Sequence, residues 1–164
     1  MRPVPEYDSR SWLLKALRET AHALEAIIWN ADASALDAQP AEDEWSPRAL
    51  LTHMAEMERR FHQRLERMVT MERPRIDAFD ADSIEAEGGE PHDIFDAIDE
   101  FGSLRQQNVY LLWSLDDRDW QRTGEHPYLG ALTVLQVARE MSEHDLAHLW
   151  QLRRTCDALQ AASV

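Results

Sequence analysis

The sequence predicts an all-α fold, and specifically a four-helix bundle, from three observations. Helix-favouring residues such as Ala, Leu, Glu and Arg are frequent, whereas the 164 residues include only five glycines. Four segments repeat apolar residues at three- and four-residue spacings, and no segment alternates convincingly with a period of two. Four helices of this length pair naturally into a bundle, and the length suits a single domain over residues 1–164.

The first two predicted helices follow from their apolar stripes and start signals. Residues 9–31 form the first helix, with a stripe of Leu13, Leu17, Leu24 and Ile28. The second begins at Ser46 and Pro47, because Ser is a favourable N-cap and Pro fits the first helical turn. Its stripe continues to Met68, and the helix is expected to end before Pro74.

An acidic stretch with two adjacent glycines, residues 72–91, separates the second and third predicted helices. We interpret it as a long exposed loop, either a disordered linker or a lid over a site. The third helix is expected to begin near Pro91 and to extend through Trp113. Gly102 within it indicates close packing or a local bend, since glycine costs a helix about 1 kcal/mol relative to alanine.

The fourth predicted helix follows a connection, residues 116–131, whose glycines and proline indicate turns. Thr133 is expected to cap this helix, which continues to about Thr155. Trp45, just before the second helix, is a candidate hydrophobic staple. Four tryptophans in helical segments are expected to pack in the core or on a dimer face: Trp12, Trp29, Trp113 and Trp150.

Charge and composition exclude several classes of function. The formal net charge is −14 without a compensating basic patch, so we expect no nucleic-acid partner. No apolar run approaches the roughly 18 residues of a membrane span, and the first residues lack the apolar core of a secretory signal. The single cysteine excludes an internal disulfide and fits a reducing cytosol, which predicts a cytoplasmic protein without a membrane partner.

Three histidines form the candidate functional site. His144 and His148 are four residues apart, which places both on one face of the fourth helix, together with apolar neighbours. His53 lies within the apolar stripe of the second helix and is also expected to face inward. Three buried imidazoles are costly unless each is hydrogen-bonded or ligated. One divalent metal ion held by all three satisfies them at once, as in other bundle metal sites.

The remaining polar candidates are interpreted as ordinary. His62 lies about half a turn from the inward face of its helix and is expected to face solvent. Asp145 follows His144 where a zincin helix carries its general base, yet it is shorter than glutamate and we expect it to face solvent. Glu56 and Glu58 are weak candidates for orienting a histidine. Cys156 is expected to be buried and not to bind metal.

Three short motifs lie in order along the chain: WSPRALLTH at residues 45–53, GALTV at 130–134 and EHDLAHLWQL at 143–152. Together they resemble the DinB-like (YfiT-like) superfamily. The resemblance covers nearly the whole chain. It implies a four-helix bundle, often a homodimer, with one metal ion bound by a histidine of the second helix and two of the fourth, which correspond to His53, His144 and His148. It also implies, for some members, thiol-dependent transferase or isomerase activity with a low-molecular-weight thiol.

The expected chemistry follows from three neutral histidines that leave coordination positions open, which is typical of a catalytic site. All-imidazole ligation suits several metals, of which we expect nickel or zinc, with iron as a further candidate. The first hypothesis is an enzyme that acts on a small-molecule substrate, either by thiol transfer, which the resemblance implies, or by hydrolysis. The second is a non-catalytic metal- or ligand-binding stress-response protein. A bundle with core histidines and no metal also remains open, and the sequence identifies no catalytic residue.

Overall fold

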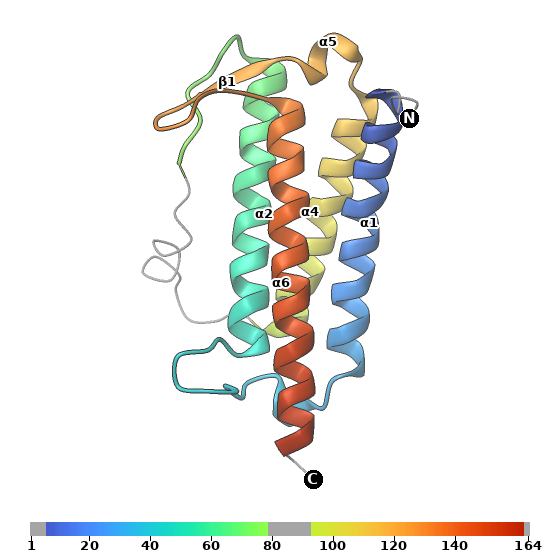
Figure 1. Ribbon diagram of the computed structural model, residues 1–164, viewed down its shortest axis with the longest axis vertical. Helices are drawn as coiled ribbons and strands as arrows, with labels where there is room; N and C mark the ends of the chain where they lie inside the picture. Colours follow the sequence, from blue (N-terminus) through green and yellow to red (C-terminus); the bar gives the residue numbers. More distant parts are fainter. Residues whose placement is uncertain (1–5, 79–92, 163–164) are drawn as a thin grey trace, which may run out of the picture.

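Four long helices run along a common axis in the computed structural model, which describes residues 6–78 and 93–162 (Figure 1). They are α1 (Glu6–Asn30), α2 (Pro47–Thr70), α4 (Ile94–Ser114) and α6 (Val134–Ala162). The predicted all-α four-helix bundle is therefore confirmed. The helix boundaries differ from the expected ones by a few residues, and α6 continues past Thr155. No helix in the described ranges is both long and apolar enough to cross a membrane.

The helices that follow one another in the chain are not all neighbours in this bundle. Although α1 and α2 are consecutive, each packs mainly against α4 and α6, so the two lie on a diagonal. Contacts between α2 and α4 advance together along both helices, from Arg59–Glu100 to His62–Asn108, so these two neighbours are parallel. Both helices begin at the same end of the bundle (Figure 1). This arrangement places α6 directly beside α2.

Side-chain caps start the two helices that carry the candidate site. The Oγ of Ser46 accepts a hydrogen bond from the backbone N–H of Ala49 at 3.2 Å, as the sequence predicts. At α6, the Oγ1 of Thr133 accepts from Gln136 N–H at 3.1 Å, and the Gln136 side chain accepts from Thr133 N–H at 2.8 Å. This reciprocal pair is a capping box. The predicted starts of both helices are confirmed.

The connection before α6 is more regular than expected. It contains a short helix, α5 (Asp117–Trp120), and a two-stranded antiparallel hairpin of β1 (Thr123–His126) and β2 (Gly130–Thr133). The sequence analysis predicted turns in this connection but did not identify its two strands. Strands of four residues are too short to show a period of two in the sequence. The connection between α1 and α2 contains a short 3₁₀ helix, η1 (Ala33–Ala35).

The start of the predicted exposed loop is attached to this hairpin. The N–H of Ile76 donates to the carbonyl of Glu125 at 3.1 Å, and the N–H of Glu125 donates to the carbonyl of Pro74 at 2.8 Å. Pro74 and Ile76 are both buried. The prediction of an exposed loop was therefore wrong for Pro74 and Ile76, whereas residues 72, 73, 75 and 77 are exposed. Residues 79–91 of the predicted loop lie outside the described residues.

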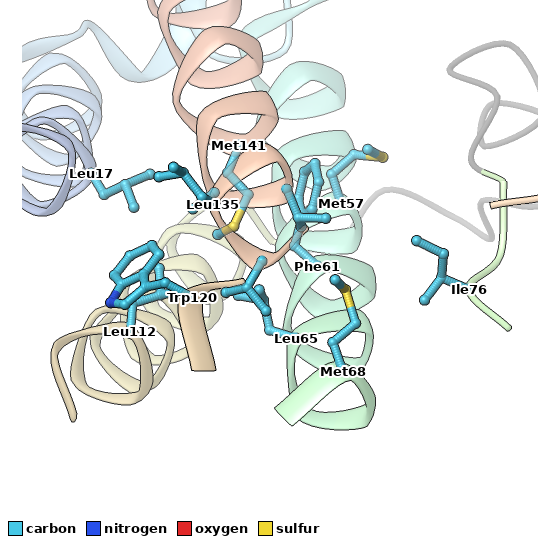
Figure 2. Packing of buried hydrophobic residues seen from close by; sticks show 13 residues of the cluster. Leu17, Met57, Phe61, Leu65, Met68, Ile76, Leu112, Trp120, Leu135 and Met141 are labelled. Carbon is cyan, nitrogen blue, oxygen red and sulfur yellow. The ribbon is translucent and has the colours of Figure 1, made fainter. Parts of the chain in front are cut away.

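The apolar core consists of two clusters stacked along the bundle. In the first, side chains of α1, α2 and α6 converge and Ile76 reaches α2 from the segment that follows it (Figure 2). The second surrounds Phe101, Leu24 and Leu152 nearer the other end. The expected core packing of Trp12, Trp29, Trp113 and Trp150 was wrong, because each is at least 61% exposed. Their predicted role at a dimer face remains a prediction.

Two glycines provide a matched test of the packing. A Cβ on Gly124 would lie 2.7 Å from Cγ2 of Ile76 and 3.1 Å from Cγ of Met68, whereas a Cβ on Gly102 would meet nothing within 4 Å. Gly102 therefore does not mark the close packing that the sequence indicated. We expect Gly124→Ala to destabilise the protein by about 1–3 kcal/mol and Gly102→Ala to stabilise it by about 0.5–1 kcal/mol. Urea unfolding measures both, and equal effects would contradict the packing described.

Candidate metal centre

Three imidazoles from two adjacent helices converge between α2 and α6. The Nε2 of His53 lies 3.1 Å from the Nε2 of His144 and 3.2 Å from that of His148. The potential ligand atoms of all three lie within 4.8 Å of one another. A zinc–nitrogen distance of about 2.0–2.1 Å places tetrahedral ligand nitrogens roughly 3.3–3.4 Å apart. The structure thus brings the three predicted residues together at a spacing that suits one metal ion.

Hydrogen bonds around the imidazoles bear on which nitrogen faces the site. The Nδ1 of His148 lies 3.0 Å from the side-chain oxygen of Gln151, an acceptor, so this nitrogen carries the proton and Nε2 presents its lone pair. The Nδ1 of His53 is buried, and no hydrogen-bond partner for it exists among the described residues. The sequence analysis did not identify Gln151 as a residue that orients His148. Its position three residues after His148 places the two side chains next to each other on the helix, which could have indicated this role.

Burial keeps the three imidazoles neutral at physiological pH. Burial, with a smaller contribution from the neighbouring imidazole of His148, lowers the pKa of His53 to about 4 and that of His144 to about 3. Burial also lowers the pKa of His148, although the hydrogen bond with Gln151 acts in the opposite direction. Neutral imidazoles keep a lone pair for a metal ion, so the donor set fits a divalent cation.

Aromatic rings form the walls of the site. The indole of Trp45 meets the His53 ring edge-on at 4.9 Å between centroids and stacks with the His148 ring at 6.3 Å. The Phe61 ring lies 6.2 Å from that of His144. These ring contacts restrain the orientations of the imidazoles through packing.

Within the described residues, no other His, Cys, Asp or Glu joins the cluster of three. Three protein ligands are typical of catalytic zinc sites, whereas structural sites usually have four. Cys156 is buried at 6% exposure, and burial raises the pKa of its thiol, as expected for a residue outside the site. A groove of about 880 Å³ lies between α1 and α4, and none of the three histidines lines it. The chemistry of the side chains, rather than cavity size, therefore locates the candidate site.

A buried guanidinium joins all four helices at the level of the site. Arg105 on α4 donates to Glu58 on α2 at 2.8 and 2.6 Å and to Asp145 on α6 at 2.6 and 3.1 Å. It also donates to the backbone carbonyl of Leu17 on α1 at 2.9 Å. Each of these charged side chains is at most 3% exposed. Asp145, the residue after His144, is therefore hydrogen-bonded to a side chain of α4 in the core.

The prediction that Asp145 faces solvent was wrong. Because α6 packs against both α1 and α2, its buried arc is wide enough to include Asp145 as well as the histidine face. Burial raises the pKa of Asp145 to about 6, against the attraction of Arg105. Burial acts to lower the pKa of Arg105, but the two carboxylates outweigh it and raise that pKa above its ordinary value.

The glutamates considered for orienting a histidine have other partners. Glu58 accepts from Arg105 and, at 2.7 Å, from the side-chain amide of Asn108. Glu56 pairs with arginines of its own helix. The expected exposure of His62 was also wrong, because its Nδ1 lies 2.7 Å from Oδ1 of Asn108 and its side chain is only 17% exposed. A polar layer therefore extends from Arg105 toward the surface beside α2.

The histidine pKa shifts predict how the stability of the metal-free protein depends on pH. The pKa values of His53 and His144 are lower in the folded state than the ordinary value of 6.5, so the unfolded chain binds more protons on acidification. Their contribution to stability is complete above about pH 6.5 and is lost as pH falls toward 4. The raised pKa of Asp145 has the opposite effect, because this carboxyl binds a proton more readily in the folded state, but its shift is smaller.

We therefore expect the free energy of unfolding of metal-free protein to be lower at pH 5 than at pH 7.5, as measured by urea titration. A variant with glutamine at His53, His144 and His148 should show a flatter dependence. The same pH dependence in both proteins would contradict the assignment of the effect to the buried imidazoles.

Fold and site together define a four-helix bundle protein with a cluster of three histidines that could hold a metal ion. The family model of the DinB superfamily matches residues 16–152, and the chain belongs to this superfamily. Its structure is similar to YfiT from Bacillus subtilis, described as a probable metal-dependent hydrolase with an unusual four-helix bundle topology, at a TM-score of 0.81 and 19% identity over 94% of this chain and 90% of YfiT.

A second solved structure, TT2238, described as a four-helix bundle protein, is similar at a TM-score of 0.64 and 21% identity, over 88% of this chain and 98% of TT2238. These two similarities show the shared fold. The sequence matches no curated protein.

Proposed function

We propose that this protein is a metal-dependent enzyme that transfers a low-molecular-weight thiol to a small electrophilic substrate. His53, His144 and His148 would hold one divalent ion, with nickel or zinc expected and iron as a further candidate. The observation that carries the proposal is the convergence of three neutral Nε2 atoms at 3.1 and 3.2 Å. A bound ion supplies Lewis-acid chemistry, because it lowers the pKa of a thiol or water molecule that reaches it.

The surroundings of the histidines bear on the choice between thiol transfer and hydrolysis. Asp145 occupies the position of a zincin general base, yet both of its oxygens accept from Arg105 in the core. It is therefore held away from any water in the site, which supports a reaction that needs no protein base. Hydrolysis is the second candidate, supported by the structural similarity to YfiT, which is described as a probable metal-dependent hydrolase.

Paired assays of metal-reconstituted protein test the two reactions. Thiol transfer predicts metal-dependent conjugation of monochlorobimane with at least one of cysteine, glutathione and coenzyme A, and its loss in His148→Ala. Hydrolysis instead predicts metal-dependent cleavage of p-nitrophenyl acetate without thiol. Retention of one equivalent of metal with neither activity would favour the non-catalytic metal-binding alternative.

The assembly and cellular location are further parts of this proposal. Exposed Trp12, Trp29, Trp113 and Trp150 support a homodimer, because large aromatic side chains are enriched at protein interfaces. The lone, buried Cys156 supports a reducing compartment, the cytoplasm. Light scattering of the purified protein tests the dimer, and a monomeric mass at micromolar concentration would contradict it.

A further inference from the structure

The surface that α1 and α4 form together carries large aromatic side chains that are exposed to solvent. The two helices are neighbours on one side of the bundle (Figure 1). Trp29 of α1 is 61% exposed, and Tyr110 and Trp113 of α4 are 69% and 70% exposed. We call this surface the α1–α4 face, defined by the residues that line the groove between the two helices together with Trp29 and Phe95. Exposed aromatic patches are typical of protein interfaces.

Two printed contacts show how α1 and α4 are aligned along the α1–α4 face. The rings of Trp29 and Phe95 lie 4.8 Å apart between centroids. Near the other end of α1, the backbone carbonyl of Leu17 accepts a hydrogen bond from Arg105 at 2.9 Å. The two helices are therefore antiparallel, and Gly102 lies at a level between these two contacts.

The exposed aromatic side chains form one group on each side of Gly102. Phe95, which contacts Trp29, lies seven residues before Gly102, about 10 Å along the helix. Tyr110, whose ring lies 6.2 Å from that of Trp113, is eight residues after Gly102, about 12 Å along the helix. A Cβ on Gly102 would meet nothing within 4 Å, so the middle of the face leaves room for another chain to approach. The two aromatic groups are thus nearly equidistant from an open centre.

Unpaired charges are also arranged on the two sides of this centre. Arg18, Glu25 and Asp99 are exposed and line the groove of the α1–α4 face. Among the described residues, none of these three side chains takes part in a hydrogen bond or an ion pair. The alignment of the helices places Arg18 on one side of the level of Gly102 and the two acids on the other. The face therefore has a basic half and an acidic half.

This distribution of charged and aromatic side chains is self-complementary about a two-fold axis at the level of Gly102. In a two-fold dimer the same surface of both copies meets, and every contact occurs twice. Arg18 of each copy would face Glu25 and Asp99 of the other, and Tyr110 of each would lie level with the Trp29–Phe95 pair of the other.

We propose that the protein forms a homodimer in which the α1–α4 face packs against the same face of a second, antiparallel copy. The complementary charges argue for a second copy as the occupant of this face, because each charged group then meets an opposite charge. This inference rests on the homodimer of the proposed function and names its interface, whereas it requires neither a metal ion nor the proposed reaction.

Charge reversal in the full-length protein tests the proposal, with the dimer dissociation constant measured by sedimentation equilibrium at low ionic strength. We expect Arg18→Glu to weaken the dimer about tenfold, because it places like charges opposite each other at both symmetric positions. Glu25→Arg/Asp99→Arg should weaken it to a similar extent. An equimolar mixture of the two variants should form a heterodimer nearly as stable as the wild-type dimer, because every reversed charge then faces its complement.

Two further variants separate the interface from general effects of charge and folding. Arg153→Glu reverses an exposed charge of α6 and changes the net charge as Arg18→Glu does, so it should leave the dimer unchanged. Gly102→Trp should abolish the dimer, because its side chain fills the open centre of the face while its Cβ meets nothing in its own chain within 4 Å. Circular dichroism of each variant establishes that its helices are intact.

A wild-type protein that stays monomeric at high micromolar concentration, or a mixture of the two charge variants that does not associate, would overturn the proposal. A dimer weakened by Trp150→Ala but not by the α1–α4 variants would overturn it as well, and would place the interface on α6. An active monomer would reject this inference and leave the proposed reaction in place. A dimer with the expected variant effects but no metal-dependent activity would instead reject the proposed reaction alone.

Discussion

Arg105→Met is expected to lower the free energy of unfolding by about 3–5 kcal/mol, the usual cost of breaking a buried ion pair on one side. The substitution removes the guanidinium that all four helices share and leaves Glu58 and Asp145 buried beside each other. Glu58 would keep its hydrogen bond from Asn108, but Asp145 would lose both of the bonds from Arg105. Urea unfolding followed by circular dichroism measures the change.

A surface pair provides the matched control for this prediction. Arg73 pairs with Glu125 at 2.6 Å but is 68% exposed, so Arg73→Met should change stability by less than about 1 kcal/mol. In the Arg105→Met background, Glu58→Gln and Asp145→Asn should recover much of the loss, because they remove the unpaired charges. This rescue remains measurable if Arg105→Met alone does not fold. An Arg105→Met effect as small as that of Arg73→Met would show that the buried network does not stabilise the bundle.

His53→Ala and His148→Ala are each expected to abolish stoichiometric metal binding while leaving the helices largely intact. Each removes one of the three candidate ligands found among the described residues, and the two come from different helices. Gln151→Leu should have a smaller effect, a loss of about 10–100-fold in affinity, because it removes only the hydrogen bond that orients His148. Competition titration with a chromogenic chelator gives the affinities.

His22→Ala is the control for these titrations, since His22 is exposed on α1 and lines the groove away from the site. It should bind metal like the wild type. Loss of binding in His22→Ala to the same extent as in His148→Ala would assign the metal to adventitious histidine contacts.

The sequence predicted the helices and the histidine cluster because both depend on local patterns. Ser46 and Thr133 start helices through bonds to residues only three positions away, so their effect is visible without a tertiary structure. His144 and His148 share a helical face by spacing alone. His53 could be added because it lies in an apolar stripe, although which helices would be neighbours was not derivable from periodicity.

The buried charged residues Arg105, Glu58 and Asp145 were missed because charged side chains usually face solvent. Arg105 and Asn108 lie between Phe101 and Leu112 at spacings of four, three and four residues, which are core positions of α4. That spacing was a usable signal. The pairing of Arg105 with Glu58 and Asp145 depends on the diagonal arrangement of α1 and α2, which no local pattern specifies.

Elemental analysis of untagged protein, purified without chelator, tests the three-histidine centre most directly when wild type is compared with His53→Ala and His148→Ala. We predict close to one equivalent of nickel, zinc or iron in the wild type and none in either variant. A wild-type protein that contains no metal and takes none up on titration, or a His148→Ala variant that retains one equivalent, would contradict the assignment of these histidines as metal ligands.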